Sequence, residues 1–378
     1  MEKPRQMPAD PAQDDLVHEL RLSLVSGVGP RMRRLLLDRF GSPRAVLEAA
    51  PSELRSVPGV GPKLMEKIVA ADREINAEEE IELCRQHGIA ILTDSSPEYP
   101  RALREIPDPP AVLFVRGRLK PEDGLAIAMV GTRHGTPYGL RQAERLAGSL
   151  ARSGLTIISG LARGIDAAAH RGALAAGGRT LAVLASGVLS IYPPEHEELA
   201  EQVIAQGALL SEAPPRAAPR SGTFPQRNRI ISGLALGAII IEAGDRSGAL
   251  ITARHAMEQG REVFALPGRV EDRTSRGCHR LIRDGAKLIE TADDVLEELG
   301  PLVAAVPRDD GQVIHHPAEL LLNELEQQVL SAIHGDATSI DEIIAETGLP
   351  VQQVLSTVSV LEMRHLIRRL SGTMVARI

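Results

Sequence analysis

The feature that most restricts the fold is an alternation of short apolar runs and amphipathic segments between residues 124 and 300. The apolar runs are rich in Ile, Val and Leu, and helical stretches such as 138–154 and 248–260 separate them. Continuous β-branched runs that alternate with helices are typical of a parallel sheet covered on both faces. We therefore predict an α/β fold, with an extended Rossmann-like domain and a parallel-rich sheet over residues 81–300. The predicted strands are 126–132, 155–160, 180–186, 208–213, 237–243, 262–268 and 286–291, and 87–94 and 110–117 are expected to extend the sheet.

An internal repeat precedes this domain. Residues 20–41 and 54–71 each contain a short apolar helix end, then Gly-Val-Gly-Pro, then an amphipathic helix. The glycines suit a tight turn, and the proline suits the first turn of the next helix, where its missing N–H costs nothing. Because the pattern occurs twice, it favours a pair of helix-hairpin-helix units. We predict a SAM-like helix-hairpin-helix α domain over residues 15–80, after a Pro- and charge-rich tail, 1–14, that we expect to be disordered.

The C-terminal residues are interpreted as a linker, 301–320, followed by a winged-helix domain, 321–378. Three helical segments precede two short strands around Ser371 and Gly372, which is the order of a winged helix. In the linker, His315 and His316 could be metal ligands, but no partner motif accompanies them. We therefore expect these two histidines to be a solvated pair.

Composition excludes several classes of protein. The formal net charge is −7, so a nucleic-acid role would have to rest on local patches. Cys84 and Cys278 stand far apart, which excludes a disulfide-dense scaffold and a multi-cysteine zinc ribbon. The N-terminus lacks an apolar signal region, and no run of about 18 apolar residues occurs. We expect a soluble, cytoplasmic protein with no metal, no cofactor and no membrane partner.

The turn after the strand at 126–132 is a candidate anion site. Gly131, Thr132 and Arg133 precede a helix here. A dinucleotide site would require G-x-G-x-x-G at this turn and an acidic residue at the end of the next strand, and neither is present. NAD binding is therefore disfavoured. Backbone N–H groups at a helix start and one guanidinium can bind an anion, although an ordinary tight turn with a solvated arginine explains the residues equally well.

The turn after the next strand repeats this chemistry. That strand ends at Ser159 and Gly160, and Arg163 lies on the turn. Asp166 could be a general base, but an Asp at a helix start is usually a cap, and we favour the cap. His170 follows one helical turn later and could hydrogen-bond to Asp166. No Ser or Cys nucleophile accompanies this pair, so the sequence does not predict a catalytic triad.

The segment 216–254 concentrates positive charge, with six arginines against two acidic side chains in a chain of negative net charge. Phe224 lies in this segment among Pro, Gly and Ser residues. An aromatic ring flanked by cations suits base stacking beside phosphate contacts. The alternative is that Phe224 packs onto the core. The binding residues predicted in this segment are Arg220, Phe224, Arg227, Asn228, Ser247 and Gly248.

A series of motifs then runs in order over about 155 residues. They are GTR at 131–133 followed by YG at 138–139, SGLARGIDAAAH at 159–170, GGRT at 177–180, YPPEH at 192–196, LLSEAPP at 209–215, FPQRNRIISGL at 224–234, EAGDRSGALITARHAMEQGR at 242–261, ALPG at 265–268 and GCHRLIRDGA at 277–286. Together they resemble the DprA/Smf family. Any one motif alone would be weak, but the ordered series is highly specific, and the likeness includes the flanking domains.

The resemblance implies a non-catalytic homodimer that binds single-stranded DNA without base specificity. It also implies that the protein protects incoming DNA and loads the RecA recombinase on it during natural transformation. In this family, phosphate binding falls to Arg133 and Arg179, and base stacking falls to Phe224. Many members have a Lys three residues before that ring, where this chain has Ser221 beside Arg220. The DNA-binding residues predicted in all are Gly131, Thr132, Arg133, Ser159, Gly160, Arg163, Arg179, Arg220, Phe224, Arg227, Asn228, Ser247 and Gly248. The family's dimer surface maps to 277–289, with Cys278, His279, Leu281, Ile282 and Leu288 as the predicted interface.

The flanking domains carry weaker signals. Residues 15–74 hold ten basic and eight acidic side chains, so phosphate binding there would be weak, and scaffolding of a dimer or partner is an equal alternative. The presumed recognition helix, 350–364, offers only Arg364 as a cation, whereas groove-reading helices usually present Arg, Lys, Asn or Gln. The winged helix is therefore either a protein-interaction module or a weak DNA binder that uses Arg368, Arg369 and Arg377.

Two other classes stay open at this point. A Rossmann-type nucleotide-binding hydrolase would use Asp166, His170 or Glu242 in catalysis. The PGGxGT-type phosphate turn of such enzymes is absent from the sequence. A pure adaptor would act through the flanking domains alone.

Overall fold

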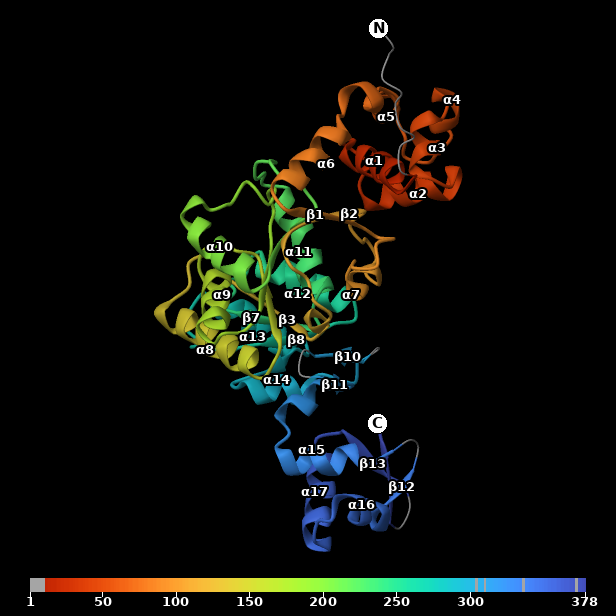
Figure 1. Ribbon diagram of the computed structural model, residues 1–378. Coiled ribbons are helices and arrows are strands. Elements are labelled where there is room, and N and C mark those ends of the chain that lie inside the picture. The colour runs from red at the N-terminus through yellow and green to blue at the C-terminus, as the bar shows by residue number, and fades with distance from the viewer. Residues whose placement is uncertain (1–10, 303–304, 309–310, 335–336, 371–372) are drawn as a thin grey trace.

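The computed structural model describes residues 11–302, 305–308, 311–334, 337–370 and 373–378. A helical domain and a small C-terminal domain lie at opposite ends of a central α/β domain (Figure 1). Of the predicted disordered tail, residues 1–10 lie outside the described residues, and the first helix begins at Pro11. Among the described residues, no helix has both the length and the apolar character that a membrane crossing requires.

The central domain is built on a nine-stranded sheet. The strand order is β1-β2-β6-β5-β4-β3-β7-β8-β9. The strands from β6 to β9 in that order are parallel, and β1 and β2 extend the edge as antiparallel strands. This confirms the predicted parallel-rich, extended Rossmann-like sheet. The strands are β1 (Ile89–Thr93), β2 (Val112–Gly117), β3 (Ala126–Gly131), β4 (Thr156–Ser159), β5 (Thr180–Val183), β6 (Ala208–Ser211), β7 (Gly237–Ile241), β8 (Glu262–Ala265) and β9 (Lys287–Leu288).

The strand order places a topological switch point at the centre of the sheet. From β3 the chain builds outward through β4, β5 and β6, and it then crosses to the other side of β3 with β7. Ligands of open α/β sheets bind beyond the carboxyl ends of the strands at such a point. The turn after Gly131 and the turn after Ile241 therefore flank the expected crevice.

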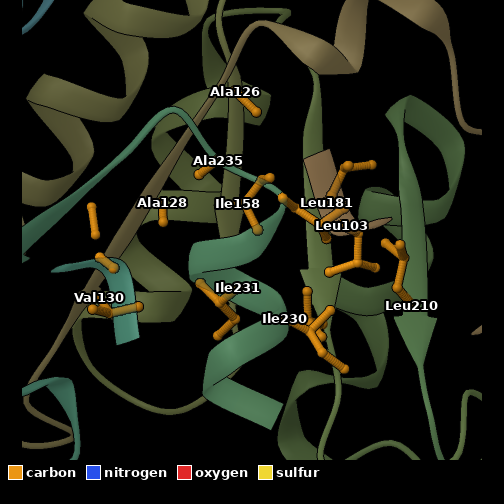
Figure 2. Packing of buried hydrophobic residues seen from close by; sticks show 14 of the residues in the cluster. Leu103, Ala126, Ala128, Val130, Ile158, Leu181, Leu210, Ile230, Ile231 and Ala235 are labelled. Carbon is orange, nitrogen blue, oxygen red and sulfur yellow. The ribbon is translucent and has the colours of Figure 1, made fainter. Parts of the chain in front are cut away.

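Helices cover both faces of this sheet, as the alternating pattern predicts. On one face, Ala126, Ala128 and Val130 of β3 pack against Ile230 and Ile231 of α11 (Figure 2). On the other face, the intervening residues of β3 pack against α8, α9 and α14. The helical elements are α7 (Arg101–Arg104), η1 (Pro121–Gly124), α8 (Pro137–Arg152), α9 (Ile165–Ala175), η2 (Pro194–His196), α10 (Glu197–Gln206), α11 (Thr223–Gly233), α12 (Ala249–Glu258), α13 (Arg276–Arg283) and α14 (Ala292–Glu298).

The N-terminal domain confirms the two predicted hairpins. Gly29 and Gly61 directly precede α2 and α5, and each helix begins with a proline. Val17 and Leu20 of α1 join a buried cluster of the α/β domain, so this helix ties the two domains together. The predicted boundary at residues 80 and 81 falls inside α6, which leads directly into β1. The helices are α1 (Pro11–Leu24), α2 (Pro30–Phe40), α3 (Pro43–Glu48), α4 (Pro51–Leu54), α5 (Pro62–Glu74) and α6 (Ala77–Gln86).

Part of the predicted linker is ordered against the α/β domain. Val306 of β10 (Val306–Pro307) and Ile314 of β11 (Val313–Ile314) pack with Leu125, which precedes β3. The solvated pair predicted at His315 and His316 is wrong for the second residue. His316 is buried, and its Nδ1 accepts a hydrogen bond from the backbone of η3 (Pro317–Leu321), so it caps that short helix.

The C-terminal residues form the predicted winged helix. Three helices are followed by an antiparallel strand pair, and a third short strand completes a sheet of order β12-β14-β13. The predicted turn at Ser371 and Gly372 lies outside the described residues. The elements are α15 (Glu324–Ser331), β12 (Thr338–Ser339), α16 (Ile340–Thr347), α17 (Val351–Met363), β13 (Ile367–Arg369) and β14 (Met374–Arg377).

Gly131 at the end of β3 provides a test of this packing. A Cβ at this position would lie 1.9 Å from the carbonyl oxygen of Ile241 and 2.5 Å from Ile165, which is closer than real contacts allow. We expect Gly131→Ala to lower the free energy of unfolding by ~1–3 kcal/mol or more, as overpacked cores do. Gly222→Ala is the matched control, because nothing lies within 4 Å of its Cβ position. Chemical denaturation of both variants measures the difference, and equal stabilities would contradict the close packing at Gly131.

Candidate nucleic-acid interface

A pocket opens at the carboxyl edge of the sheet, beside the switch point. It is formed by the turns after β3, β4 and β5, by the segment before α11 and by the start of that helix. We call it the Phe224 pocket. Its lining residues are Arg133, Gly160, Ala162, Arg163, Ala185, Ser186, Tyr192, Pro193, Pro219 and Phe224.

Phe224 lies in this pocket between a cation and a second ring. The Cζ atom of Arg133 is 4.8 Å from the centroid of the Phe224 ring. The Tyr192 ring meets Phe224 edge to face, with 5.9 Å between the centroids. Phe224 is only half-buried, and it belongs to none of the buried core clusters of the described residues. The geometry therefore disfavours the core-packing alternative for Phe224.

Tyr192 is a pocket residue that the sequence analysis missed. Tyr192 is 36% exposed, and its ring contacts Phe224. A usable signal was present, because the two prolines that follow Tyr192 indicate a loop, and an aromatic ring on a surface loop is a candidate binding residue. Its neighbour Pro193 lines the same pocket.

Beneath the pocket, Arg227 is buried rather than exposed to solvent. Its guanidinium donates to the carbonyl oxygen of Gly160, at 2.7 Å, and to that of Val183. Burial lowers the pKa of Arg227 to about 10, while Asp166 opposes that shift. Arg227, which the sequence predicts to contact DNA, therefore fixes α11 to the ends of β4 and β5.

The turn after β4 is also held from within. Ser159 is buried and its hydroxyl donates to the carbonyl oxygen of Met129 at 2.6 Å. Asp166 accepts a hydrogen bond from the backbone N–H of Gly160 at 3.2 Å. Burial raises the pKa of Asp166, and Arg227 acts against that rise. Asp166 is therefore a structural carboxylate, but it stabilises the loop before α9 instead of capping the helix, whose N-cap residue is Gly164.

The turn after β3 is braced by Glu242, the residue that follows β7. Its carboxylate accepts hydrogen bonds from the backbone N–H and the hydroxyl of Thr136, at the start of α8. Its carbonyl oxygen accepts the N–H of Thr132 at 2.7 Å. Arg133 is left exposed at the tip of the turn.

The rim of the edge carries the remaining predicted cations. Arg163 is exposed and pairs with Glu195. Arg220 is exposed and forms no ion pair within the described residues. Asn228 donates to the carbonyl oxygen of Gly248 at 3.3 Å, and the hydroxyl of Ser247 accepts the N–H of Ala249 at 3.3 Å. These residues join α11 to the start of α12.

Arg179 does not lie with the others. It precedes β5, so it stands at the amino edge of the sheet, opposite the Phe224 pocket. Its guanidinium forms two hydrogen bonds to Asp123, at 2.8 and 2.9 Å, and also contacts the carbonyl oxygen of Arg118. The resemblance grouped Arg179 with Arg133, but the fold separates them and commits Arg179 to an ion pair.

His170 faces the interior of the sheet layer. Its Nδ1 lies 2.7 Å from the hydroxyl oxygen of Thr180, and that hydroxyl donates its proton to the carbonyl oxygen of Ile157. Nδ1 must therefore carry the proton of the neutral ring. The anticipated hydrogen bond to Asp166 is absent among the described contacts. Nε2 is buried without a hydrogen-bond partner in the part of the chain that the structure covers.

The predicted dimer residues divide between core and surface. Cys278 and Leu281 are buried in the central core, and burial raises the pKa of the Cys278 thiol to about 11. His279, Ile282 and Leu288 instead line an open hollow at the β9 edge. Only the latter three can meet another molecule directly.

The predicted cations of the winged helix differ in their surroundings. Arg369 pairs with Glu362 at 2.9 Å, and Arg377 pairs with Glu319 at 3.7 Å. Arg368 is exposed. Large apolar side chains are exposed on α17, including Met363 and Val351. This surface fits the protein-interaction alternative better than the DNA-binding one.

Comparisons with known proteins cover all three parts of the chain. The family model described as DNA recombination-mediator protein A matches residues 90–300. A DprA winged-helix domain model matches residues 315–373. A SAM-like helix-hairpin-helix tandem model matches residues 19–74.

Similar proteins extend the match over the full length. Protein Smf of Synechocystis is 35% identical over 96% of this chain and 98% of its own length. DNA processing protein DprA of Bacillus subtilis is 46% identical over 57% of this chain and 73% of its own length. The crystal structure of DNA processing protein A from Streptococcus pneumoniae aligns with a TM-score of 0.63 at 35% identity, covering 76% of this chain and 98% of that one.

A second solved structure, of DNA processing protein A from Helicobacter pylori, is described in terms of its single-stranded DNA binding mode. It aligns with a TM-score of 0.50 at 31% identity and covers 55% of this chain and 93% of that one.

The buried imidazole of His170 leads to a pH-dependent prediction. Burial lowers its pKa from 6.5 to about 3. Below about pH 6.5 the unfolded chain therefore binds a proton that the folded chain does not accept until about pH 3. With respect to this group, the free energy of unfolding is highest above about pH 6.5. It falls by about 1.4 kcal/mol per pH unit as the pH decreases from about 6.5 to about 3.

We expect His170→Asn to remove this dependence, because the Asn amide can donate to Thr180 and does not titrate. Between about pH 6 and pH 4, the variant should lose stability less steeply than the wild type, by about one proton. Chemical denaturation at several pH values measures both slopes. Identical slopes would show that His170 is not held neutral by burial.

Proposed function

The chain belongs to the DprA/Smf family of DNA-processing, recombination-mediator proteins, and on that basis we propose that it binds single-stranded DNA through the Phe224 pocket without base specificity. The single observation that carries this proposal is the half-buried Phe224 ring, which lies beside the exposed Arg133 at the switch point of the sheet.

Ring and cation serve two different parts of a nucleotide. Every base has a π face, so stacking on an aromatic ring tolerates any sequence. A guanidinium makes charge-assisted hydrogen bonds to phosphate. Because Arg133 lies over the Phe224 ring, a base stacked in the pocket would bring its phosphate within reach of the same guanidinium. Tyr192 would limit the pocket on the side where its ring edge meets Phe224.

Within this proposal, Gly160 lines the pocket, the buried Ser159 and Arg227 support it from beneath, and the polar groups of these residues do not bind DNA. Their polar groups are already bonded to each other and to neighbouring strands. Arg220 and Gly248 are exposed near the same edge and would provide further backbone contacts. Arg179 lies at the opposite edge, so we assign it a structural role.

We further propose that the protein acts as a homodimer, protects incoming DNA and delivers it to the RecA recombinase. The description of the matching family as a recombination mediator supports this role. The hollow lined by His279, Ile282 and Leu288 is the surface we assign to the partner protomer. Val270, which is 80% exposed, adds apolar area to it.

The rival reading as a nucleotide hydrolase finds little support in the geometry. Asp166 and His170 are buried and point into the fold, and the carboxylate of Glu242 is engaged by Thr136. We therefore propose that the protein has no catalytic turnover and acts by binding.

The pocket is tested by comparing Arg133→Ala with Phe224→Ala. Loss of Arg133 removes one phosphate contact, so the slope of log K against log salt should flatten by about 0.7 for a single strand. Loss of Phe224 should cost roughly 1–3 kcal/mol of binding free energy and leave the slope nearly unchanged. Fluorescence anisotropy with oligothymidylate over a salt series measures both quantities.

Arg85→Ala is a matched control, since Arg85 is exposed on α6 and forms an ion pair with Glu82. The double variant should be non-additive, because Arg133 and Phe224 touch each other. Should Phe224→Ala bind like the wild type wherever it is folded, the stacking role is excluded.

The absence of turnover is tested at Asp166. Asp166→Asn keeps an acceptor for the Gly160 N–H but removes the charge beside Arg227. We expect the variant to have a lower free energy of unfolding, and we expect neither the wild type nor the variant to hydrolyse nucleotides. Nucleotide hydrolysis by the wild type that vanishes in the folded variant would instead favour the hydrolase.

A further inference from the structure

A groove lined by arginines lies between α8 and α9, away from the residues of the Phe224 pocket. The two helices run side by side on one face of the sheet (Figure 1). Arg141, Arg145 and Arg152 come from α8, and Arg171 comes from α9. We call these four residues the arginine groove. Its other lining residues are Gln142, Glu144, Gly148, Gly172, Ala175 and Ala176.

Helical periodicity places the α8 arginines in one row. Positions 141, 145, 148 and 152 are spaced by four, three and four residues, which is the spacing of a single helix face. Gly148 stands in the same row, and a Cβ there would lie 3.1 Å from the carbonyl oxygen of Gly172 on α9. A Cβ on Gly172 would lie 2.3 Å from the carbonyl oxygen of Glu144. Gly148 and Gly172 thus let the two helices pack closely beneath the arginine side chains.

The charge of the arginine groove is not neutralised by the protein. Arg145 donates to Gln142 and to the carbonyl oxygen of Glu290, and Arg152 donates to Ser149. All of these acceptors are neutral groups. Within the described ranges, Arg141 and Arg171 have no side-chain partner. Glu144 is the one acidic residue in the lining, so the groove carries a net charge of about +3.

Some other arginines of this domain have carboxylate partners. Arg163, Arg179 and Arg229 each pair with a carboxylate at 2.5 to 2.8 Å. In a chain with a net charge of −7, four exposed arginines that share one groove and lack carboxylate partners create a local positive potential that attracts anions.

We propose that the arginine groove binds the phosphate backbone of a nucleic-acid segment beyond the one held in the Phe224 pocket. The lack of apolar anchors argues against a protein partner, since protein interfaces rely on buried aromatic, Met and other apolar side chains. The described lining contains no aromatic residue and no large apolar one. With no ring to stack on a base, contact would be to phosphates only.

This inference rests on the proposed function for its partner class, DNA, but it uses different residues. It predicts that the pocket and the arginine groove contribute separately. The second segment can come from a continuation of the bound single strand or from an adjoining duplex, and both present the same phosphate chemistry.

The test uses the full chain and the triple variant Arg141→Gln/Arg152→Gln/Arg171→Gln. These side chains are exposed and unpaired with carboxylates, so the fold should be preserved, and a thermal melt checks this. Arg145 is left intact because it bonds to the backbone of Glu290. The control Arg85→Gln/Arg101→Gln/Arg254→Gln removes the same charge from exposed helix surfaces, where each arginine has a carboxylate partner.

Three probes separate the possible ligands. They are an oligothymidylate of about ten nucleotides, near the size that one binding module covers, one several times longer, and a duplex of that greater length. We expect the short strand to bind the triple variant normally. For the long strand or the duplex, the salt slope should flatten by about two units and affinity should fall about 10- to 100-fold near 0.1 M salt. The probe that loses affinity identifies the source of the second segment.

Unchanged binding of both long probes would overturn the proposal. This is the result expected if the arginine groove instead bound an acidic protein. An equal loss for the short strand would also overturn it, since the arginines would then belong to the first site. Phe224→Ala is measured beside the triple variant. If that substitution has no effect while the triple variant weakens long DNA, the Phe224 pocket fails and the arginine groove stands.

Single Arg141→Gln and Arg171→Gln variants should each give about a third of the slope change, because each removes one phosphate contact. They also keep the proposal testable if the triple variant melts early.

Discussion

The buried guanidinium of Arg227 is the interaction on which the candidate site depends. It bonds to the carbonyl oxygens of Gly160 and Val183, which lie at the ends of neighbouring strands. Because Phe224 precedes it by three residues on α11, this anchor sets where the ring lies above the sheet edge. The nearby carboxylate of Asp166 offsets the cost of burying the charge. A side chain that sequence reasoning treated as a DNA contact is thus the support for the residues that remain accessible.

The glycines of the two turns follow from the same constraint. A Cβ on Gly160 would meet the Arg227 guanidinium at 2.5 Å, and one on Gly164 would meet the carbonyl oxygen of Thr132 at 2.3 Å. Gly164 also has a φ of +77°, which favours glycine. The small residues therefore allow the turns after β3 and β4 to pack against each other, so that Arg133 and Arg163 are presented side by side at the edge.

The arginines that can bind a ligand are determined by burial and ion pairing, not by the overall composition of the chain. Several arginines of the α/β domain pair with a carboxylate, among them Arg163, Arg179 and Arg229, although the chain as a whole is acidic. Among the described residues, the arginines without an ion pair include Arg133 and Arg220 at the carboxyl edge and the row of arginines on α8 and α9. The clustering of exposed cations at these two places raises the local positive potential, which attracts phosphate groups.

The sequence by itself determined the architecture and the family. Apolar periodicity defined the parallel sheet, the repeated Gly-Val-Gly-Pro defined the hairpins, and the ordered motifs identified the relatives. These signals are local or cumulative along the chain, so they survive without coordinates. The sequence also singled out Arg133 and Phe224, because an arginine in a turn between a strand and a helix, and an aromatic ring among Pro, Gly and Ser residues, can be recognised without coordinates. Tertiary structure alone decided which arginine is exposed, since burial depends on strands far apart in the chain. It buried Arg227, moved Arg179 to the opposite edge, added Tyr192 to the pocket and left the arginines of α8 and α9 without carboxylate partners.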